Sequence, residues 1–217
     1  MKSEELVQQY AAGTRDFSKA TLVKIKLHQT NLSGVALCRA CLCEAELLAV
    51  NLYKADLSGA DLWKANLTKA DLIEANLARA DLTEANLSEA MLIGANLYET
   101  TLAGGKLLWA NMTGANLSRA MLMGANLVGA NLAGANLFGA ILLEANLAGV
   151  NLSRANLTGV DLTGVNLMEV NLKGAIMPDG KIYYENKYFP KNNKETEKQL
   201  STHKISHRKF MLERSLV

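Results

Sequence analysis

The sequence predicts an all-β solenoid, in which the chain turns around one axis and stacks its coils as a parallel β-helix. Every fifth residue from Leu22 to Leu172 is leucine, with Met112 as the sole exception. Phe17 begins the same series, which runs through residues 15–174 without an insertion or a deletion. Because self-similarity at a short fixed period is the signature of repeat architectures, this spacing decides the fold class.

A period of five fits neither of the regular elements. In an α-helix a step of five residues turns by about 140°, so the leucines would scatter around the helix axis. In a straight strand an odd step places successive leucines on opposite faces. The chain must therefore turn once in every pentad so that all the leucines point into a common interior.

Each pentad divides its places between interior and surface. The residue two before each leucine shares its inward face, and this residue is usually alanine. Asparagine or aspartate, a variable residue and often glycine fill the other three places, which face water. Glycine at the last place suits a turn that needs an unhindered backbone. Successive coils are expected to stack at about 4.8 Å with parallel backbone pairing.

The pattern A-(N/D)-L-x-x resembles that of the pentapeptide-repeat family, as pentads 55–59 and 60–64 illustrate. The resemblance covers residues 15–174 and implies a right-handed, four-sided β-helix of about eight coils. The residues before the repeats add a short N-terminal capping helix to the predicted fold. The terminal segments 10–17 and 172–180 are similar to those of cyanobacterial members, including one that acts in heterocyst patterning.

The chain ends suggest how the stack is closed. Ser3 is the expected N-cap of a short helix that stops at Gly13, with Leu6 and Tyr10 lying over the first coil. We expect four segments: an N-terminal helical cap at 1–14, the β-helix at 15–176, a C-terminal cap turn at 177–184, and a basic tail, flexible or partly helical, at 185–217.

Charge separates the repeats from the tail. Residues 16–176 hold twelve Lys/Arg against fourteen Asp/Glu, whereas the chain from Met177 onward holds nine against five. We expect the tail to make at most weak contact with nucleic acid or acidic surfaces. In the tail, His203 and His207 could share a helix face, and a basic helix is the favoured interpretation over a metal site.

Residues 120–143 contain no charge but keep asparagine and glycine in the five-residue register, so no membrane association is predicted. The first five residues lack the apolar stretch of a signal peptide, which favours a cytoplasmic location. Cys38, Cys41 and Cys43 lie close together and could form a metal or redox cluster. With no fourth ligand or histidine recurring nearby, the favoured interpretation is that they replace polar wall residues of a reduced protein. No metal and no cofactor is therefore expected.

Residues twenty apart should stack, which explains most polar residues without a ligand. The expected columns are Lys24, Glu44, Lys64 and Glu84; Lys54 and Glu74; Arg79, Glu99 and Arg119; and Asn76, Asn96, Asn116, Asn136 and Asn156. Opposite charges neutralise each other across adjacent coils, and the amides can bond along the axis. The carboxylates are paired in these columns and the three histidines are scattered along the chain. A convex prism also offers no cleft for a substrate, so the sequence does not predict an enzyme.

Apolar residues at outer places are not required by the fold and mark candidate partner sites. Three groups are expected: Met121, Met123, Phe138, Ile141 and Leu143; Tyr53, Ile73, Met91 and Ile93; and Leu108 with Trp109. Methionine-rich surfaces adapt to several partners, so the first group is preferred. The alternative is that these side chains only pack along the wall.

We therefore predict a non-enzymatic scaffold that binds another protein of unknown identity. The cyanobacterial resemblance implies a regulatory role in signalling or differentiation. Some members of the family mimic duplex DNA and inhibit or protect gyrase, but such mimicry needs a strongly negative surface, which the near-neutral repeats lack. Self-association as a structural protein is a third hypothesis, and the number of chains in the assembly stays open.

Overall fold

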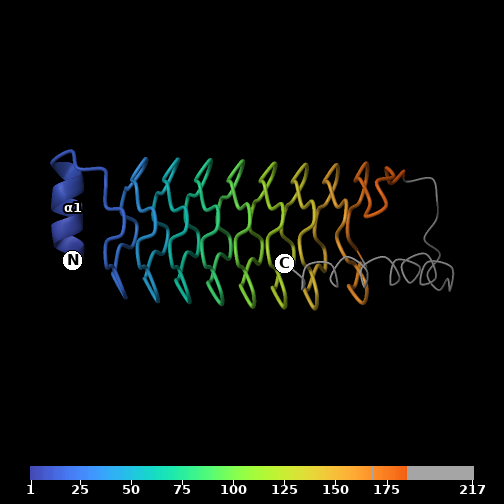
Figure 1. Cartoon of the computed structure of the whole chain (residues 1–217), viewed down its shortest axis with the longest axis horizontal. Helices are drawn as coiled ribbons and strands as arrows, with labels where there is room; N and C mark the ends of the chain where they lie inside the picture. The colour runs from blue at the N-terminus through green and yellow to red at the C-terminus, as the bar shows by residue number, and fades with distance from the viewer. Residues whose placement is uncertain (168, 185–217) are drawn as a thin grey trace, which may run out of the picture.

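The computed structural model describes residues 1–167 and 169–184, which form one elongated stack of coils with a helix across its N-terminal end (Figure 1). Helix α1 (Ser3–Ala11) is the only helix in this part of the chain. The repeats form short isolated bridges instead of long strands. Within the described residues no helix has the length and apolar character needed to cross a lipid bilayer.

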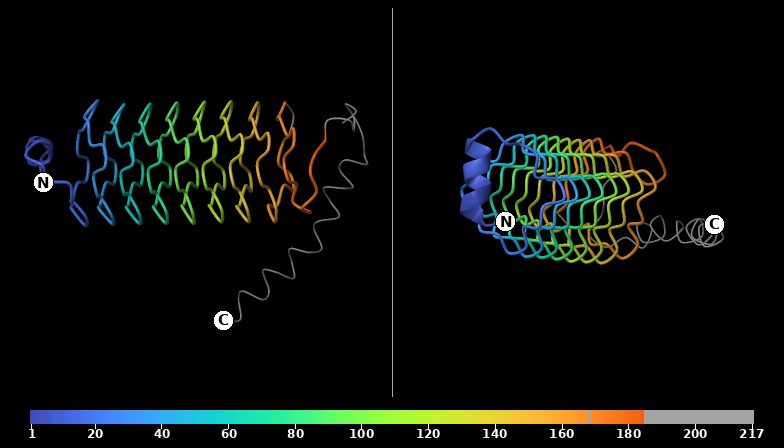
Figure 2. Two further views of the ribbon diagram at one scale, coloured as in Figure 1. Left: turned by 90° about the horizontal axis from the view of Figure 1, so that it is seen from above. Right: turned by 60° about the vertical axis from the view of Figure 1, so that its left-hand side comes forward.

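Backbone pairing links residues that are twenty apart. Asp16 pairs in parallel with Ala36, and the same offset recurs along the chain as far as the pair of Asn156 with Ile176. Since twenty residues contain four pentads, each coil has four short sides. Figure 2 shows these coils stacked along one axis. The fold prediction of a stacked parallel solenoid is therefore confirmed.

Pentads through the middle of the stack repeat the same hydrogen bonds, as the one around Leu62 shows. Its N–H donates to the carbonyl oxygen of Asp81 in the following coil at 2.7 Å, while the N–H of Asp61 donates to Ala40 in the preceding coil at 3.0 Å. Its carbonyl oxygen accepts from Ala65 at 2.9 Å, which closes the corner. The polar groups of the wall thus have partners above, below or across a corner.

The corner explains why glycine is frequent at the fifth place of the pentad. Lys64 occupies this place with φ of 55°, in the left-handed region that glycine enters without steric cost. Lysine, glutamate and arginine nevertheless fill many corners with the same backbone geometry. A local bond supports the turn, because the Asp61 carboxylate accepts the N–H of Trp63 at 3.1 Å. The Asn and Asp residues of the repeat therefore serve the corner.

The interior is a continuous column of leucines beside a column of small residues, and both are buried. Met112, the one break in the leucine series, is also fully buried. Thr100 replaces alanine in the small column, and its hydroxyl donates a 2.8 Å hydrogen bond to the carbonyl oxygen of Leu77. A polar residue is tolerated there because its hydroxyl has a partner inside the wall.

Helix α1 begins at Ser3, but Lys2 is its N-cap residue. The prediction that Ser3 caps the helix is therefore wrong. The Ser3 hydroxyl oxygen instead accepts the N–H of Lys26 at 3.3 Å, so this side chain links the helix to the first coil. A serine hydroxyl can accept a hydrogen bond from a backbone N–H of the helix or from one of the coil. In this structure it accepts from the coil and does not cap the helix.

Two residues of α1, Leu6 and Tyr10, face the coils. Leu6 is fully buried and belongs to the core, and Tyr10 packs against the same core. The Tyr10 hydroxyl donates to the carbonyl oxygen of Ser33 at 2.8 Å. The helix ends at Ala11, and Gly13 follows with φ of 101°, as expected of a residue that ends a helix.

At the other end the chain doubles back on the last coil. The N–H of Gly180 donates to Met177 at 2.8 Å and closes a turn. Ile182 then pairs antiparallel with Ile176, and Tyr183 donates to the carbonyl oxygen of Ala175 at 2.7 Å. The predicted basic tail, with His203 and His207, lies outside the described residues.

The predicted side-chain columns are present on the outside of the stack. Ion pairs join Lys24 to Glu44, Lys54 to Glu74, Lys64 to Glu84 and Arg79 to Glu99, at 3.3, 3.4, 3.3 and 3.0 Å. The amide ladder runs from Asn76 to Asn156 with steps of 3.0 to 3.4 Å. These exposed pairs each contribute little to stability, and their main effect is a surface with balanced charge.

Candidate protein-binding surface

Five apolar side chains lie together on two neighbouring coils and the corner beside them. We call this group the Met121 surface; its members are Met121, Met123, Phe138, Ile141 and Leu143. Met121 pairs directly with Ile141, and the N–H of Gly124 donates to Leu143 at 2.9 Å. The ladder therefore holds the two outer rows of this surface one coil apart.

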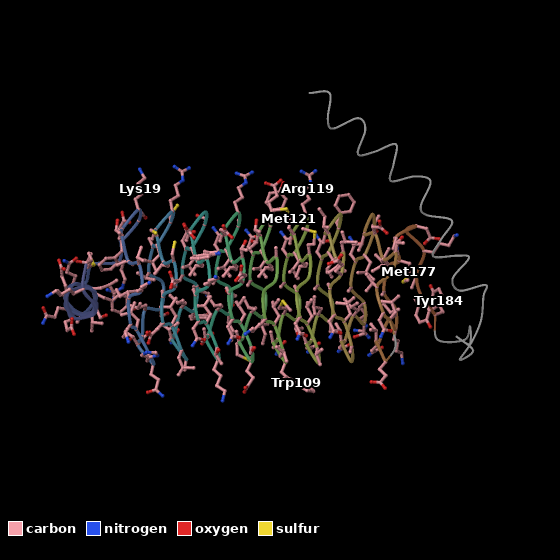
Figure 3. The ribbon with its side chains drawn as sticks, turned by 90° about the horizontal axis from the view of Figure 1, so that it is seen from below. Lys19, Trp109, Arg119, Met121, Met177 and Tyr184 are labelled. Carbon is pink, nitrogen blue, oxygen red and sulfur yellow. The ribbon has the colours of Figure 1, made fainter. Side chains whose placement is uncertain are left out.

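All five members of the Met121 surface are well exposed, from 41% for Met121 to 50% for Leu143. The stretch 120–143 that carries them contains no charged residue, whereas Arg119 and Glu144 flank it. Figure 3 shows Met121 and Arg119 along the same edge of the stack. The structure thus brings the preferred group together as one apolar patch with charges at its rim.

A network of charged and phenolic groups lies beside this surface. Glu99 accepts from the Tyr98 hydroxyl at 2.6 Å and from Arg79 at 3.0 Å. These interactions, the Tyr98 hydrogen bond first, lower the pKa of the Glu99 carboxyl, and Glu99 in turn raises the pKa of the Arg79 guanidinium. Arg119 also reaches the Tyr98 hydroxyl at 3.3 Å. The rim therefore carries fixed charge beside the apolar patch.

The second predicted group lies on another side and is less accessible. Tyr53, Ile73 and Ile93 are half-buried, and Met91 is exposed. The ammonium of Lys54 lies 5.0 Å from the centre of the Tyr53 ring. Interaction with Tyr53 is the leading cause of the raised pKa of this lysine. This column therefore offers less exposed apolar surface than the Met121 surface.

In the third group, Trp109 lies at the opposite edge from Met121 (Figure 3). Leu108 is half-buried, whereas Trp109 is 66% exposed. Trp109 occupies a corner with φ of 57°, a conformation that is unfavourable for a bulky side chain. The three predicted groups are thus separate, and the structure does not join them into one site.

Some exposed apolar residues were missed in the sequence. Val23 and Leu48 hold the variable place of their pentads and are exposed by 45% and 36%. Val23 lies on the same side as Met123, five coils earlier by residue number. The signal that finds them is an apolar residue at an outer place of the pentad, here directly after the leucine. Neither residue has a stacked aliphatic neighbour twenty residues away.

The cysteines show a contact that was not predicted. The Cys41 and Cys43 sulfurs lie 3.4 Å apart, and the Asp61 carboxylate joins them in one cluster. Burial, followed by the hydrogen bond with Asp61, raises the pKa of the Cys43 thiol to about 12. Cys38 instead accepts from the Ser58 hydroxyl at 3.3 Å. Asp61 was missed because it is twenty residues away in sequence and one coil away in space.

The sequence matches the family described as Pentapeptide repeats, in eight copies, over residues 30–68, 51–89, 65–104, 80–119, 106–139 and 145–179. The chain belongs to the pentapeptide-repeat family. Members of this family form right-handed quadrilateral β-helices and are in general structural or binding proteins without enzymatic activity. No curated protein sequence matches the chain.

Solved structures of other pentapeptide-repeat proteins are similar to this chain. HetL from the cyanobacterium Nostoc sp. strain PCC 7120, described as involved in the regulation of heterocyst differentiation, is 37% identical over 84% of this chain and all of its own, with a TM-score of 0.40. The match bears out the predicted resemblance to cyanobacterial members. The trypsin-treated fluoroquinolone resistance protein QnrB1 is 18% identical over 73% of this chain and 85% of its own, with a TM-score of 0.54, which shows the shared fold. Rfr23 from the cyanobacterium Cyanothece 51142 is 38% identical over 54% of this chain and 65% of its own, with a TM-score of 0.24.

Proposed function

We propose that this pentapeptide-repeat protein is a non-enzymatic scaffold that binds a protein partner through the Met121 surface. The observation that supports the proposal is the patch itself. Five exposed apolar side chains gather on adjacent coils, although the fold needs only polar or small residues at those places. A contiguous apolar patch with a polar rim is typical of protein-binding sites.

The chemistry of the patch favours a protein over other ligands. Met121 and Met123 are flexible and polarisable, so they can adapt to an uneven apolar surface. Phe138 adds an aromatic ring, a residue type that is enriched at protein interfaces. Arg119 and Glu99 lie at the rim, 3.5 Å apart, and charges in this position set orientation and association rate more than affinity.

The charge pattern disfavours mimicry of DNA. Mimicry would require a surface with a dense and uncompensated negative charge. Glu44, Glu74 and Glu84 each pair with a lysine in the neighbouring coil. The likeness to QnrB1 concerns the fold alone, so it does not favour an action on gyrase.

The proposal also concerns the role of the protein in the cell and its location there. HetL, 37% identical over 84% of the chain, is described as involved in the regulation of heterocyst differentiation, and we propose a regulatory role of this general kind. We also propose a cytoplasmic location. The three cysteines are free thiols, and reduced thiols are typical of cytosolic proteins.

The test is affinity capture from native cell extract with the wild type and the double variant Met123→Asp/Leu143→Asp. The matched control is Ala133→Asp/Ser153→Asp, which places two carboxylates at the same twenty-residue spacing elsewhere on the wall. A protein retained by wild type and control but lost by the surface variant supports the proposal. Equal recovery by the surface variant overturns it.

Light scattering distinguishes binding of a different protein from the competing hypothesis of self-association. The wild type and both variants are compared at several concentrations. If the wild type forms oligomers that only the surface variant loses, the patch joins copies of this chain, and the scaffold hypothesis is replaced by a self-associating structural role. If the mass is unchanged, the capture result reports a different protein.

A further inference from the structure

We propose that Cys41, Cys43 and Asp61 form a binding site for a thiophilic divalent cation of the zinc class. The three side chains belong to one side of two adjacent coils, and one ligand atom from each lies within 4.8 Å of the others. The two sulfurs are 3.4 Å apart. This cluster is far from the Met121 surface in sequence and does not depend on the function proposed above.

The separations fit a tetrahedral zinc site. A zinc–sulfur bond of about 2.3 Å places two sulfurs roughly 3.8 Å apart at a tetrahedral angle. The Cys41 and Cys43 sulfurs therefore need to separate by only about 0.4 Å to bind one ion. Two sulfurs and the Asp61 carboxylate supply three ligands, which leaves a fourth position for water. The ligand set is thus that of an open site.

The fold holds the ligands before a metal arrives. Cys41 pairs with Asp61 in the parallel ladder, and its own N–H donates to Ala20 at 2.9 Å. The carbonyl oxygen of Cys43 accepts from Lys24 at 2.9 Å. Cys41 and Cys43 lie on either side of the inward-facing Leu42, and their sulfurs, 3.4 Å apart, project from the same side of the coil. The backbone positions are thereby set by ladder bonds in both directions.

Neighbouring residues orient the carboxylate and leave its charge available. The N–H of Trp63 donates to one oxygen of Asp61 at 3.1 Å, the type of outer bond that fixes a metal ligand. Lys64, at the corner that follows Asp61, lies over the Trp63 ring at 4.4 Å and pairs with Glu84 at 3.3 Å. Its ammonium is thus committed elsewhere.

Binding is an exchange of protons for metal. As each sulfur–metal bond forms, the thiol releases its proton to the solvent, and no electron is transferred. Thiolate ligands favour zinc and cadmium, whereas magnesium and calcium prefer oxygen ligands. The site therefore discriminates between these classes by its two sulfurs.

The experiment titrates tag-free, full-length reduced protein with Cd²⁺ and follows the ultraviolet charge-transfer absorption of the cadmium–thiolate bond. Zn²⁺ is added in competition, and Mg²⁺ and Ca²⁺ serve as hard cations. We expect one equivalent of Cd²⁺ to bind, to be displaced by Zn²⁺ and to resist Mg²⁺ and Ca²⁺. Tryptophan fluorescence should change in parallel, because Trp63 lies two residues from Asp61 and its backbone N–H donates to this ligand.

Variants decide which residues hold the ion. Cys41→Ser/Cys43→Ser should abolish the charge-transfer band, while Cys38→Ser should leave it unchanged. Asp61→Asn should weaken affinity by at least about 10-fold. This variant is expected to fold, because asparagine takes the same place in many pentads and Asn66 accepts the equivalent N–H of Thr68 at 3.1 Å. Asp81→Asn, one coil farther along the same column, is the matched control.

The proposal is overturned by any of four results. The first is binding that persists in the Cys41→Ser/Cys43→Ser variant. The second is binding that depends on the tail, as a loss in His203→Ala/His207→Ala would show. The third is a wild type that fails to bind one equivalent of either Cd²⁺ or Zn²⁺. The fourth is equal affinity of Asp61→Asn and wild type, which would remove Asp61 from the site as proposed.

Discussion

The indole ring of Trp109 lies directly over Gly129 in the next coil, where a Cβ atom would overlap the ring. The two residues occupy the same corner of adjacent coils, and both have positive φ. The absence of a side chain at Gly129 is thus what lets the tryptophan lie along the wall. Sequence alone gives Gly129 the ordinary role of a corner glycine, and its second role depends on the neighbouring coil.

Gly129→Ala should destabilise the protein more than the same change at Gly149. Gly149 is in the same column, and a methyl group added there would meet nothing within 4 Å. Its substitution therefore costs only the left-handed backbone, about 1–2 kcal/mol. At Gly129 the added methyl also displaces Trp109, which adds about 1 kcal/mol or more. Urea unfolding measures both, and tryptophan emission should shift only in Gly129→Ala. Equal effects would show that the ring does not rest on Gly129.

Truncation of a buried leucine should lower the stability of the protein, whereas exchange of the buried methionine for leucine should change it little. Leu92 is fully buried, so Leu92→Ala should lower the free energy of unfolding by about 2–5 kcal/mol. Met112→Leu restores the pattern at a buried place and should change stability by less than about 1.5 kcal/mol. Chemical denaturation of both variants tests this contrast. A large loss in Met112→Leu would mean that the interior there has a shape that leucine cannot fill.

The Glu99 carboxyl should titrate below the usual range of glutamate. Because its pKa is lowered in the folded protein, the contribution of this group to stability is present above its ordinary pKa and lost as pH falls through the lowered value. Tyr98→Phe removes the leading cause and should raise the pKa. Carbon-detected NMR titration of the side chain measures the shift. A Tyr98→Phe variant with an unchanged pKa would assign the effect to Arg79.

Cys43 should resist alkylation at pH values where ordinary thiols react. Its pKa is raised to about 12, against about 8.5 for a free cysteine, so at pH 9 little thiolate is present. In a Cys38→Ser/Cys41→Ser background, the alkylation rate should still be rising well above pH 9. Adding Asp61→Asn should move the profile to lower pH, because the carboxylate beside the thiol loses its charge. A rate that levels off near pH 9 would contradict the raised pKa.

Docking of α1 should stabilise the N-terminal end of the stack. Leu6 is fully buried, whereas its neighbour Val7 is exposed. Leu6→Ala should therefore accelerate hydrogen exchange of amides in the first coil, including Leu22 and Leu27, and Val7→Ala should not. The effect should fade along the axis, because each coil contacts only its neighbours. Uniform acceleration along the whole stack would indicate that it opens as a single unit.

The fold could be predicted because the same five-residue pattern recurs in thirty-two consecutive pentads, so that Leu22 and Leu172 still share one register. The columns followed from the same rule, since Arg79 and Glu99 stack wherever coils hold twenty residues. The N-terminal segment before the repeats follows no such rule, and there the prediction that Ser3 caps the helix was wrong. The Ser3 hydroxyl could accept from a backbone N–H of the helix or of the first coil, and it accepts from Lys26 in the coil. The approach of Asp61 to two sulfurs also depended on side-chain rotamers, which a period cannot specify.

The place of a residue within the twenty-residue coil decides on which side of the prism its side chain lies. Cys41 and Met121 are eighty residues apart and therefore share one side of the prism, about four coils from each other. Removing one pentad between them would carry Met121 a quarter turn around the axis, while removing four would shorten the distance and keep both on one side. Insertions and deletions of five residues are thus rotations of one half of the molecule against the other. A protein built in this way can change which surfaces face together without altering its interior.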